Sequence, residues 1–156
     1  MQYLCEQQTQ PCKFSCVATS LAVLAGRPAQ EFHDRFHKRY WEDRLSIGDA
    51  LRELGIPFKS FDSAERNSIE EPAIYLCNVP SLNIVGGSHQ VLIEVLDDAN
   101  WRVYDPAQGV FVDGQPRKYY TAHVPDIETE PLAVQMTGGY NIDAAIFHAD
   151  LLEWRK

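Results

Sequence analysis

The chain has 156 residues, the size of one ordinary domain, and 45% of them are hydrophobic. Its net charge is −8, whereas nucleic-acid binding needs a basic surface, so we expect no nucleic-acid partner. No apolar run approaches the length of a bilayer, and the N-terminus has neither a basic nor an apolar signal region. We therefore expect one cytoplasmic domain, 1–156, with no membrane partner. Specialised export or particle-borne delivery stays open, as does the oligomeric state.

The first third of the chain predicts helices. Residues 15–26 are apolar nearly all round and end at Gly26, which indicates a buried helix with a glycine stop. Aromatic residues at every fourth position predict a second helix over 29–41. A third helix is predicted over 46–54, because Ser46 with an aspartate three residues later resembles a capping box.

The later part of the chain predicts strands after a charged connection over 62–71. A turn over 97–100 joins two of these strands into an antiparallel hairpin. Residues 146–155 predict a terminal helix. Helices first and strands later favour an α+β domain, with N-terminal helices packed on an antiparallel sheet. The predicted strands are 56–61, 73–79, 88–96, 101–105 and 110–112.

Cysteine and histidine spacings give a weak metal signal. The spacing of Cys12 and Cys16 suits one pair of zinc ligands, but no second pair of comparable quality exists. His33 and His37 would share a helix face, where solvent-facing roles are more common. We expect no metal and no cofactor. A cytoplasmic setting would keep all four cysteines reduced: Cys5, Cys12, Cys16 and Cys77.

Cys16 is the candidate nucleophile. A thiol attacks as thiolate, and a helix N-terminus or a nearby imidazolium lowers a thiol pKa from about 8.5. Cys16 lies in the first turn of the predicted helix, after Ser15 as the N-cap, and His89 could supply the imidazolium. The N–H of Cys16 and the side-chain amide of Gln10 could stabilise an oxyanion. Cys12 is the competing candidate, but it precedes the helix and would miss its dipole.

His89 and Asp105 are the candidate base and its orienting acid. They lie sixteen positions apart across the predicted hairpin, so both should emerge near the same sheet edge. Pro106 ends the second strand and restricts the backbone of Asp105. Taken singly, Cys16 and His89 are more often core residues. Together with Gln10 in this order, they favour a thiol acyl-transfer site.

The segment Gln10 to Gly26 resembles the active-site helix of the bacteriocin-processing, double-glycine-leader peptidases, a family of papain-like cysteine peptidases. The resemblance covers about 8–112 and implies a papain-like fold. It implies that Cys16, His89 and Asp105 are catalytic and that Gln10 lies in the oxyanion hole. The other segments that carry the resemblance are Leu51–Ile56, Pro72–Tyr75, Ser88–Ile93 and Val103–Gly109.

The chain departs from the family pattern in three ways. The family has Asp-Cys-Gly around the nucleophile, where this chain has serine before Cys16 and Val17 after it. These 156 residues contain no counterpart of the membrane and ATP-binding domains of the family's transporter members, so we expect a standalone enzyme. Residues 118–156 have no counterpart and form a C-terminal extension of unknown role. We expect Val17, Gly87 and Ser88 to bind substrate.

These features predict a cysteine hydrolase that cleaves a peptide or isopeptide bond of a peptide or protein substrate through a thioester. Two alternatives stay open. The same side chains could perform glutamine deamidation or transamidation. The domain could also be an inactive scaffold in a secretion or phage assembly, because a fold does not guarantee its function.

Overall fold

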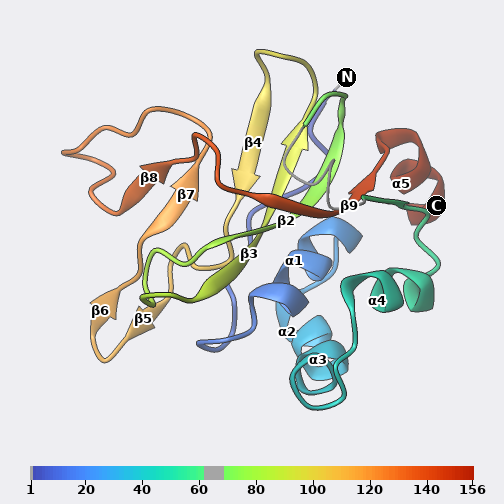
Figure 1. Cartoon of the computed structure of the whole chain (residues 1–156), viewed down its shortest axis with the longest axis horizontal. Helices are drawn as coiled ribbons and strands as arrows, with labels where there is room; N and C mark the ends of the chain where they lie inside the picture. The colour runs from blue at the N-terminus through green and yellow to red at the C-terminus, as the bar shows by residue number, and fades with distance from the viewer. Residues whose placement is uncertain (1, 62–68) are drawn as a thin grey trace.

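The computed structural model describes residues 2–61 and 69–156, so residues 62–68 of the predicted charged connection lie outside the described part. Its centre is a five-stranded sheet in the order β1-β9-β2-β3-β4, with every neighbouring pair antiparallel (Figure 1). Helices and this sheet together confirm the expected α+β class. The strands are β1 (Lys59–Ser60), β2 (Ala73–Pro80), β3 (Ser88–Val95), β4 (Trp101–Tyr104) and β9 (Asn141–Ile146).

The predicted helix boundaries are confirmed where capping signals are present. Gly26 and Gly55 end their helices with φ of 68° and 75°, the left-handed region that favours glycine. Ser46 and Asp49 form the predicted capping box. The helices are α1 (Cys16–Ala25), α2 (Ala29–Phe32), α3 (Lys38–Glu42), α4 (Ile47–Leu54) and α5 (His148–Arg155).

The helix predicted over 29–41 contains an irregular middle. A π-helical turn, η1 (His33–His37), joins α2 to α3. The aromatic spacing that predicted this helix still holds, because Phe32 and Phe36 are both buried and their rings pack edge to face at 5.3 Å. His33 and His37 are the first and last residues of this π turn.

The sheet has a hydrophobic core on each face. On one face, α1 packs against β3 and buries Leu21 and Leu24 against Leu92. On the other face, Tyr75 and Ile93 pack with Tyr120 of β7 (Tyr119–Thr121) and with Met136, which follows β8 (Ala133–Gln135). Figure 1 shows the helices and the β7–β8 pair on opposite sides of the sheet.

The region 118–156 is an integral part of this fold. Strand β9 lies between β1 and β2 in the sheet, and its Ile142 and Ile146 are fully buried. No strand was predicted at β9 from the sequence. The terminal helix predicted over 146–155 begins at His148. The expected short strand near 110–112 is β5 (Phe111–Val112), which forms a hairpin with β6 (Gln115–Pro116).

A buried carboxylate ties the N-terminal segment to the sheet. Glu94 on β3 is fully buried and accepts hydrogen bonds from the backbone N–H groups of Leu4 and Cys5, at 2.8 and 3.1 Å. It also accepts from Tyr104 Oη and from His148 Nε2, both at 3.0 Å. Burial by itself raises the pKa of Glu94, but the bond to His148 and the backbone donors outweigh it and hold that pKa below its usual value.

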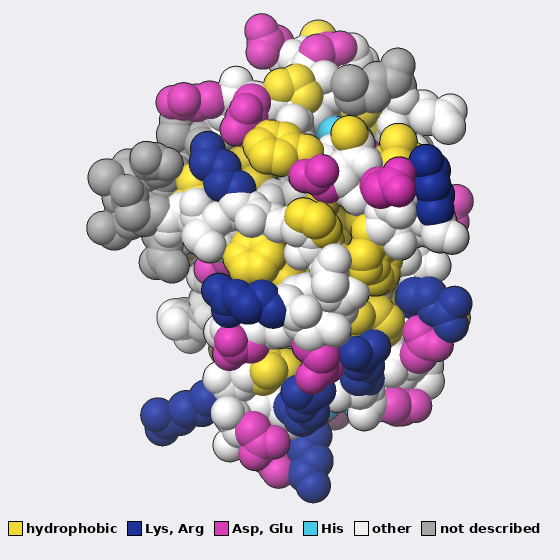
Figure 2. Space-filling view, turned by 90° about the vertical axis from the view of Figure 1, so that its right-hand side faces the viewer, with side chains coloured by type: hydrophobic (Ala, Val, Ile, Leu, Met, Phe, Trp, Pro, Cys, Tyr) yellow, Lys and Arg dark blue, Asp and Glu magenta, His cyan; other side chains and the backbone are white. Residues whose placement is uncertain are grey.

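The surface around α4 and α5 mixes apolar and charged groups. Figure 2 shows exposed hydrophobic side chains interspersed with basic and acidic ones on the side that lies to the right in Figure 1. Long charged side chains of this kind cover apolar surface while keeping their heads in water. In the described part of the chain, no helix combines the length and apolar character needed to cross a bilayer.

Candidate active site

Cys16 is the first residue of α1 and is partly exposed. Ser15 occupies the predicted N-cap position, but its side chain makes no capping hydrogen bond to the helix. Its Oγ instead accepts from the N–H of Cys12 at 3.2 Å. Within the described chain, the first turn of α1 is therefore left without a side-chain cap beside the thiol, and unpaired N–H groups there favour negative charge.

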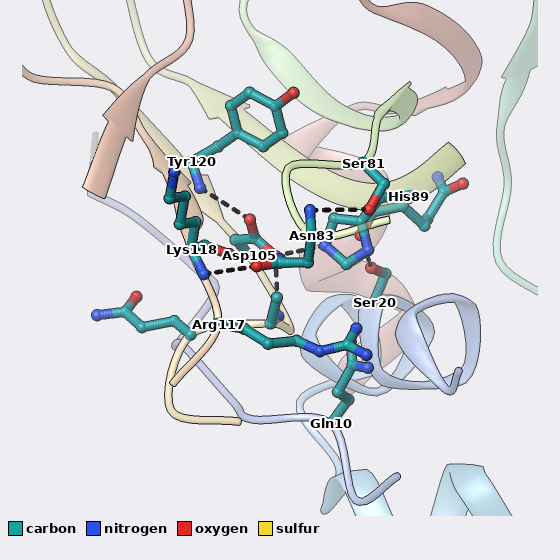
Figure 3. Close-up of polar contacts among 12 residues, drawn as sticks. Gln10, Ser20, Ser81, Asn83, His89, Asp105, Arg117, Lys118 and Tyr120 are labelled. Carbon is teal, nitrogen blue, oxygen red and sulfur yellow. Dashed lines mark hydrogen bonds and ion pairs between the residues drawn. The ribbon is translucent and has the colours of Figure 1, made fainter. Parts of the chain in front are cut away.

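Asp105 is a buried carboxylate held by three donors. It directly follows β4 and is 1% exposed. Its Oδ1 accepts from Nε2 of His89 at 2.5 Å and from the N–H of Ala107 at 2.9 Å. Its Oδ2 accepts from the N–H of Tyr120 at 2.8 Å (Figure 3). The sequence prediction that the hairpin brings His89 and Asp105 together is confirmed.

His89 links this carboxylate to the thiol. It lies near the start of β3, and its side chain is 12% exposed. Burial lowers the pKa of His89, but hydrogen bonds to Asp105 and then to Cys16 outweigh this effect and raise it to about 10. Because Asp105 contacts Nε2, Nδ1 is the nitrogen left for Cys16. The predicted nucleophile, base and acid thus lie together.

Gln10 lies near this group, but its amide is engaged with the chain. It is 4% exposed, and its Nε2 donates to the carbonyl oxygens of Cys12 and Lys13 at 2.8 and 3.0 Å. Its Oε1 is buried and has no hydrogen-bond partner among the described residues. Both amide hydrogens are used by the loop before α1, so Gln10 braces that loop. Its oxyanion role stays a prediction, and it requires one of these bonds to be exchanged.

The three residues expected to bind substrate lie in different surroundings. Val17 is 6% exposed and its side chain packs in the helix-side core. Gly87 closes a turn by donating to the carbonyl of Ile84 at 3.0 Å, and its own carbonyl accepts from the N–H of Ser81 at 2.9 Å. Ser88 is exposed at the start of β3, next to His89. Their roles in substrate binding stay predictions.

Residues 117–120 support the site and were missed by sequence reasoning. Arg117 Nη1 donates to the carbonyl of Lys13 at 3.3 Å, and Lys118 pairs through both backbone groups with the side chain of Asn83, at 2.8 and 2.9 Å (Figure 3). Tyr120 adds its N–H to Asp105. These contacts join three segments of the site. Most use backbone groups on one side, which leave no trace in residue identity.

The N-terminal segment packs against the loop that follows Asp105. The N–H of Gln10 donates to the carbonyl of Pro106 at 2.9 Å, and Thr9 Oγ1 donates to the carbonyl of Gln108 at 2.7 Å. Gly109 has φ of 91°, and a Cβ there would lie 2.9 Å from Thr9 Oγ1. The glycine of the Asp-Pro-x-x-Gly segment is therefore required by both conformation and space.

Two other features lie outside the group formed by Cys16, His89 and Asp105. A cavity of about 740 Å³ is lined mainly by the N-terminal segment, β4 and β7, and neither Cys16 nor His89 lines it. A second set of chemically reactive side chains, Cys12, His33 and His37, lies beside the loop before α1. The cavity therefore does not coincide with the candidate active site, which is defined by the hydrogen bond between His89 and Asp105.

Comparisons of the chain with profiles of known protein families, with curated proteins and with solved structures found no match.

Proposed function

We propose that this protein is a papain-like cysteine hydrolase that cleaves a peptide or isopeptide bond. The observation that carries the proposal is the bond from buried Asp105 to Nε2 of His89, together with the place of Cys16 at the first turn of α1, where its thiol helps to raise the pKa of that imidazole. A nucleophile, a base and a group that orients the base are the parts that covalent acyl transfer requires. The similarity of residues 8–112 to the bacteriocin-processing peptidases supports the same reaction class.

The reaction follows from this order. Nδ1 of His89 takes the proton of the Cys16 thiol, and the thiolate attacks the substrate carbonyl carbon. Unpaired N–H groups of the first turn of α1 stabilise the oxyanion. The imidazolium then gives its proton to the leaving amine as the carbon–nitrogen bond breaks. Water, deprotonated by His89, attacks the resulting thioester and releases the acid and the free thiol.

Asp105 acts through His89 in this scheme. Three donors fix its carboxylate, so the imidazole is held with one nitrogen toward the acid and the other toward the thiol. The carboxylate also favours the imidazolium that forms during the reaction. The bond to Asp105 favours the tautomer of neutral His89 that carries its proton on Nε2. The proposed reaction uses no metal or cofactor.

The test is covalent labelling by a thiol-directed peptidyl probe, located by peptide mapping. We expect labelling at Cys16 in the wild type, none in Cys16→Ala, and at least about tenfold slower labelling in His89→Ala, because the imidazolium no longer favours the thiolate. Cys12→Ala is the matched control, since Cys12 is a partly exposed cysteine of the same segment, and with a metal chelator in all samples it should label as the wild type does.

Persistent labelling in Cys16→Ala would overturn the site assignment. A Cys16 that alkylates near pH 6 no faster than an ordinary thiol would favour the inactive scaffold. Release of ammonia from a glutamine substrate without backbone cleavage would instead identify a deamidase.

A further inference from the structure

Three side chains with metal-binding atoms converge beside the loop that precedes α1. Cys12 lies in that loop, and His33 and His37 are the first and last residues of η1. One ligand atom from each lies within 4.8 Å of the other two, and all three residues are partly buried. Cys12 Sγ is 3.6 Å from Nε2 of His37. The three residues therefore form a compact cluster, which we call the Cys12 cluster.

His33 and His37 are the two ends of the π-helical turn. Positions four apart lie on the same side of a helix, in a π turn as in an α-helix. The rings of His33 and His37 accordingly stack at 4.6 Å, with 18° between their planes. Single π turns inside helices are frequent at functional sites. Here the turn aligns two imidazoles beside one thiol.

The separation of sulfur and nitrogen suits a shared metal ion. Zinc lies about 2.3 Å from a thiolate sulfur and about 2.0–2.1 Å from an imidazole nitrogen. A tetrahedral angle then places sulfur and nitrogen about 3.5–3.6 Å apart. Cys12 Sγ and His37 Nε2 already stand at 3.6 Å. All three ligand atoms lie within 4.8 Å of one another, so the third ligand has only about 1 Å to move to reach the same spacing.

The donor set selects the class of metal. One thiolate and two imidazoles suit zinc and other ions that prefer sulfur and nitrogen, whereas magnesium and calcium prefer oxygen. Nδ1 of His33 is buried and has no hydrogen-bond partner among the described residues, and its ion-pair contact with Asp34 Oδ1 is 3.6 Å long. A second reactive thiol–imidazole pair fits less well, because the contacts of the described residues give His37 no carboxylate to orient it. Metal ligation uses all three side chains.

We propose that Cys12, His33 and His37 bind a zinc-class divalent metal ion, with a fourth position open to water. The ion would hold the loop before α1 against η1. That loop positions the candidate site, since the carbonyl of Cys12 accepts from Gln10 Nε2 at 2.8 Å and its N–H donates to Ser15 Oγ at 3.2 Å. The metal therefore has a positioning role for Gln10 and the start of α1. The binding proposal does not depend on the proposed hydrolase function.

The test measures Zn²⁺ binding in the Cys16→Ala background, which removes the other thiol that faces an imidazole. Isothermal titration should show one equivalent bound. Cys12→Ser or His37→Ala in the same background should weaken binding at least about 100-fold, since loss of outer-shell partners alone can cost up to that factor. His123→Ala is the matched control, because His123 is an exposed histidine paired with Glu130, and it should leave binding unchanged.

A second measurement needs no change in the cluster itself. Zn²⁺ should slow alkylation of Cys12 in the Cys16→Ala protein, as read by peptide mapping, and Co²⁺ should give a thiolate-to-metal charge-transfer band. The buried Cys5 and Cys77 serve as internal references whose alkylation should not respond to the metal. Unchanged Cys12 alkylation, or full Zn²⁺ binding in the folded Cys12→Ser variant, would overturn the proposal.

Discussion

Nε2 of His89 lies 2.5 Å from Oδ1 of Asp105, and this contact decides which imidazole nitrogen is left for Cys16. The carboxylate cannot turn away, because the N–H groups of Ala107 and Tyr120 hold it at 2.9 and 2.8 Å. Asp105 is 1% exposed and accepts three hydrogen bonds, so it holds the imidazole in a fixed orientation.

Asp105→Asn should slow alkylation of Cys16 at neutral pH by at least about tenfold. An asparagine that keeps its oxygen toward Tyr120 N–H turns its NH₂ toward His89. Nε2 must then accept, so the proton moves to Nδ1 and the imidazole can no longer deprotonate the thiol. Alkylation rates at Cys16, measured by mass spectrometry, check this. Asp126→Asn, at an exposed turn, is the control, and equal rates in both variants would contradict it.

The contribution of His89 to stability should fall as pH rises. Its pKa is about 10 in the folded protein, against 6.5 for a free histidine, so the folded state binds more protons between these values. The stabilisation is fully present below about pH 6.5 and is lost as pH rises through about 10. The difference in unfolding free energy between wild type and His89→Gln should therefore shrink, by at least about 1.4 kcal/mol from pH 6 to 10.

Denaturant unfolding of both proteins at several pH values checks this prediction. Taking the difference between the two proteins cancels the titration of groups that they share. A difference that stays constant or grows from pH 6 to 10 would show that His89 does not retain its proton in the folded state.

Glu94→Gln should destabilise the fold by about 1–3 kcal/mol for each buried donor that it leaves without an acceptor. The amide has one oxygen to serve the four donors that now bond to the carboxylate, and its NH₂ would face some of them. Chemical unfolding measures the change. Glu153→Gln, whose partner Lys156 is exposed, should change stability by less than about 0.5 kcal/mol. Similar effects of the two substitutions would contradict the role of Glu94.

Gly109→Ala should lower stability by about 1–2 kcal/mol from its left-handed φ of 91°, with a further loss from the contact with Thr9. Because Thr9 belongs to the segment that leads to Gln10, Cys16 alkylation should also slow. Gly114→Ala is a matched control: it has φ of 77° but open space around its Cβ, so it reports conformation alone. Thermal unfolding compares the two, and an equal loss in both would remove the role of the Thr9 contact.

Local signals predicted the parts of the fold that depend on neighbouring residues. The stops at Gly26 and Gly55 and the cap at Ser46 each depend on a few adjacent backbone groups, so residue type is enough. Strand β9 was not predicted, because its short apolar end, 144–146, suits a helix or a strand equally well. Its place inside the sheet depends on pairing with β2, far away in the sequence.

The Cys12 cluster shows the same limit. The sequence predicts that His33 and His37 share a helix face, and it pairs Cys12 weakly with Cys16. Only the packing of η1 against the loop before α1 placed Cys12 next to the histidines. The π turn that stacks their rings also has no signal in the aromatic spacing that predicted the helix.

Residue types and their spacing were enough to predict the chemistry of the candidate site: a thiol at a helix start, with an imidazole and a carboxylate across a hairpin. Spacing and side-chain chemistry suffice for this, because hairpins and helix starts are local structures. The tertiary structure alone decided that Tyr120 fixes Asp105 and that Gln10 braces a loop. Those contacts use backbone groups, which every residue carries, so they form only where packing brings distant segments together.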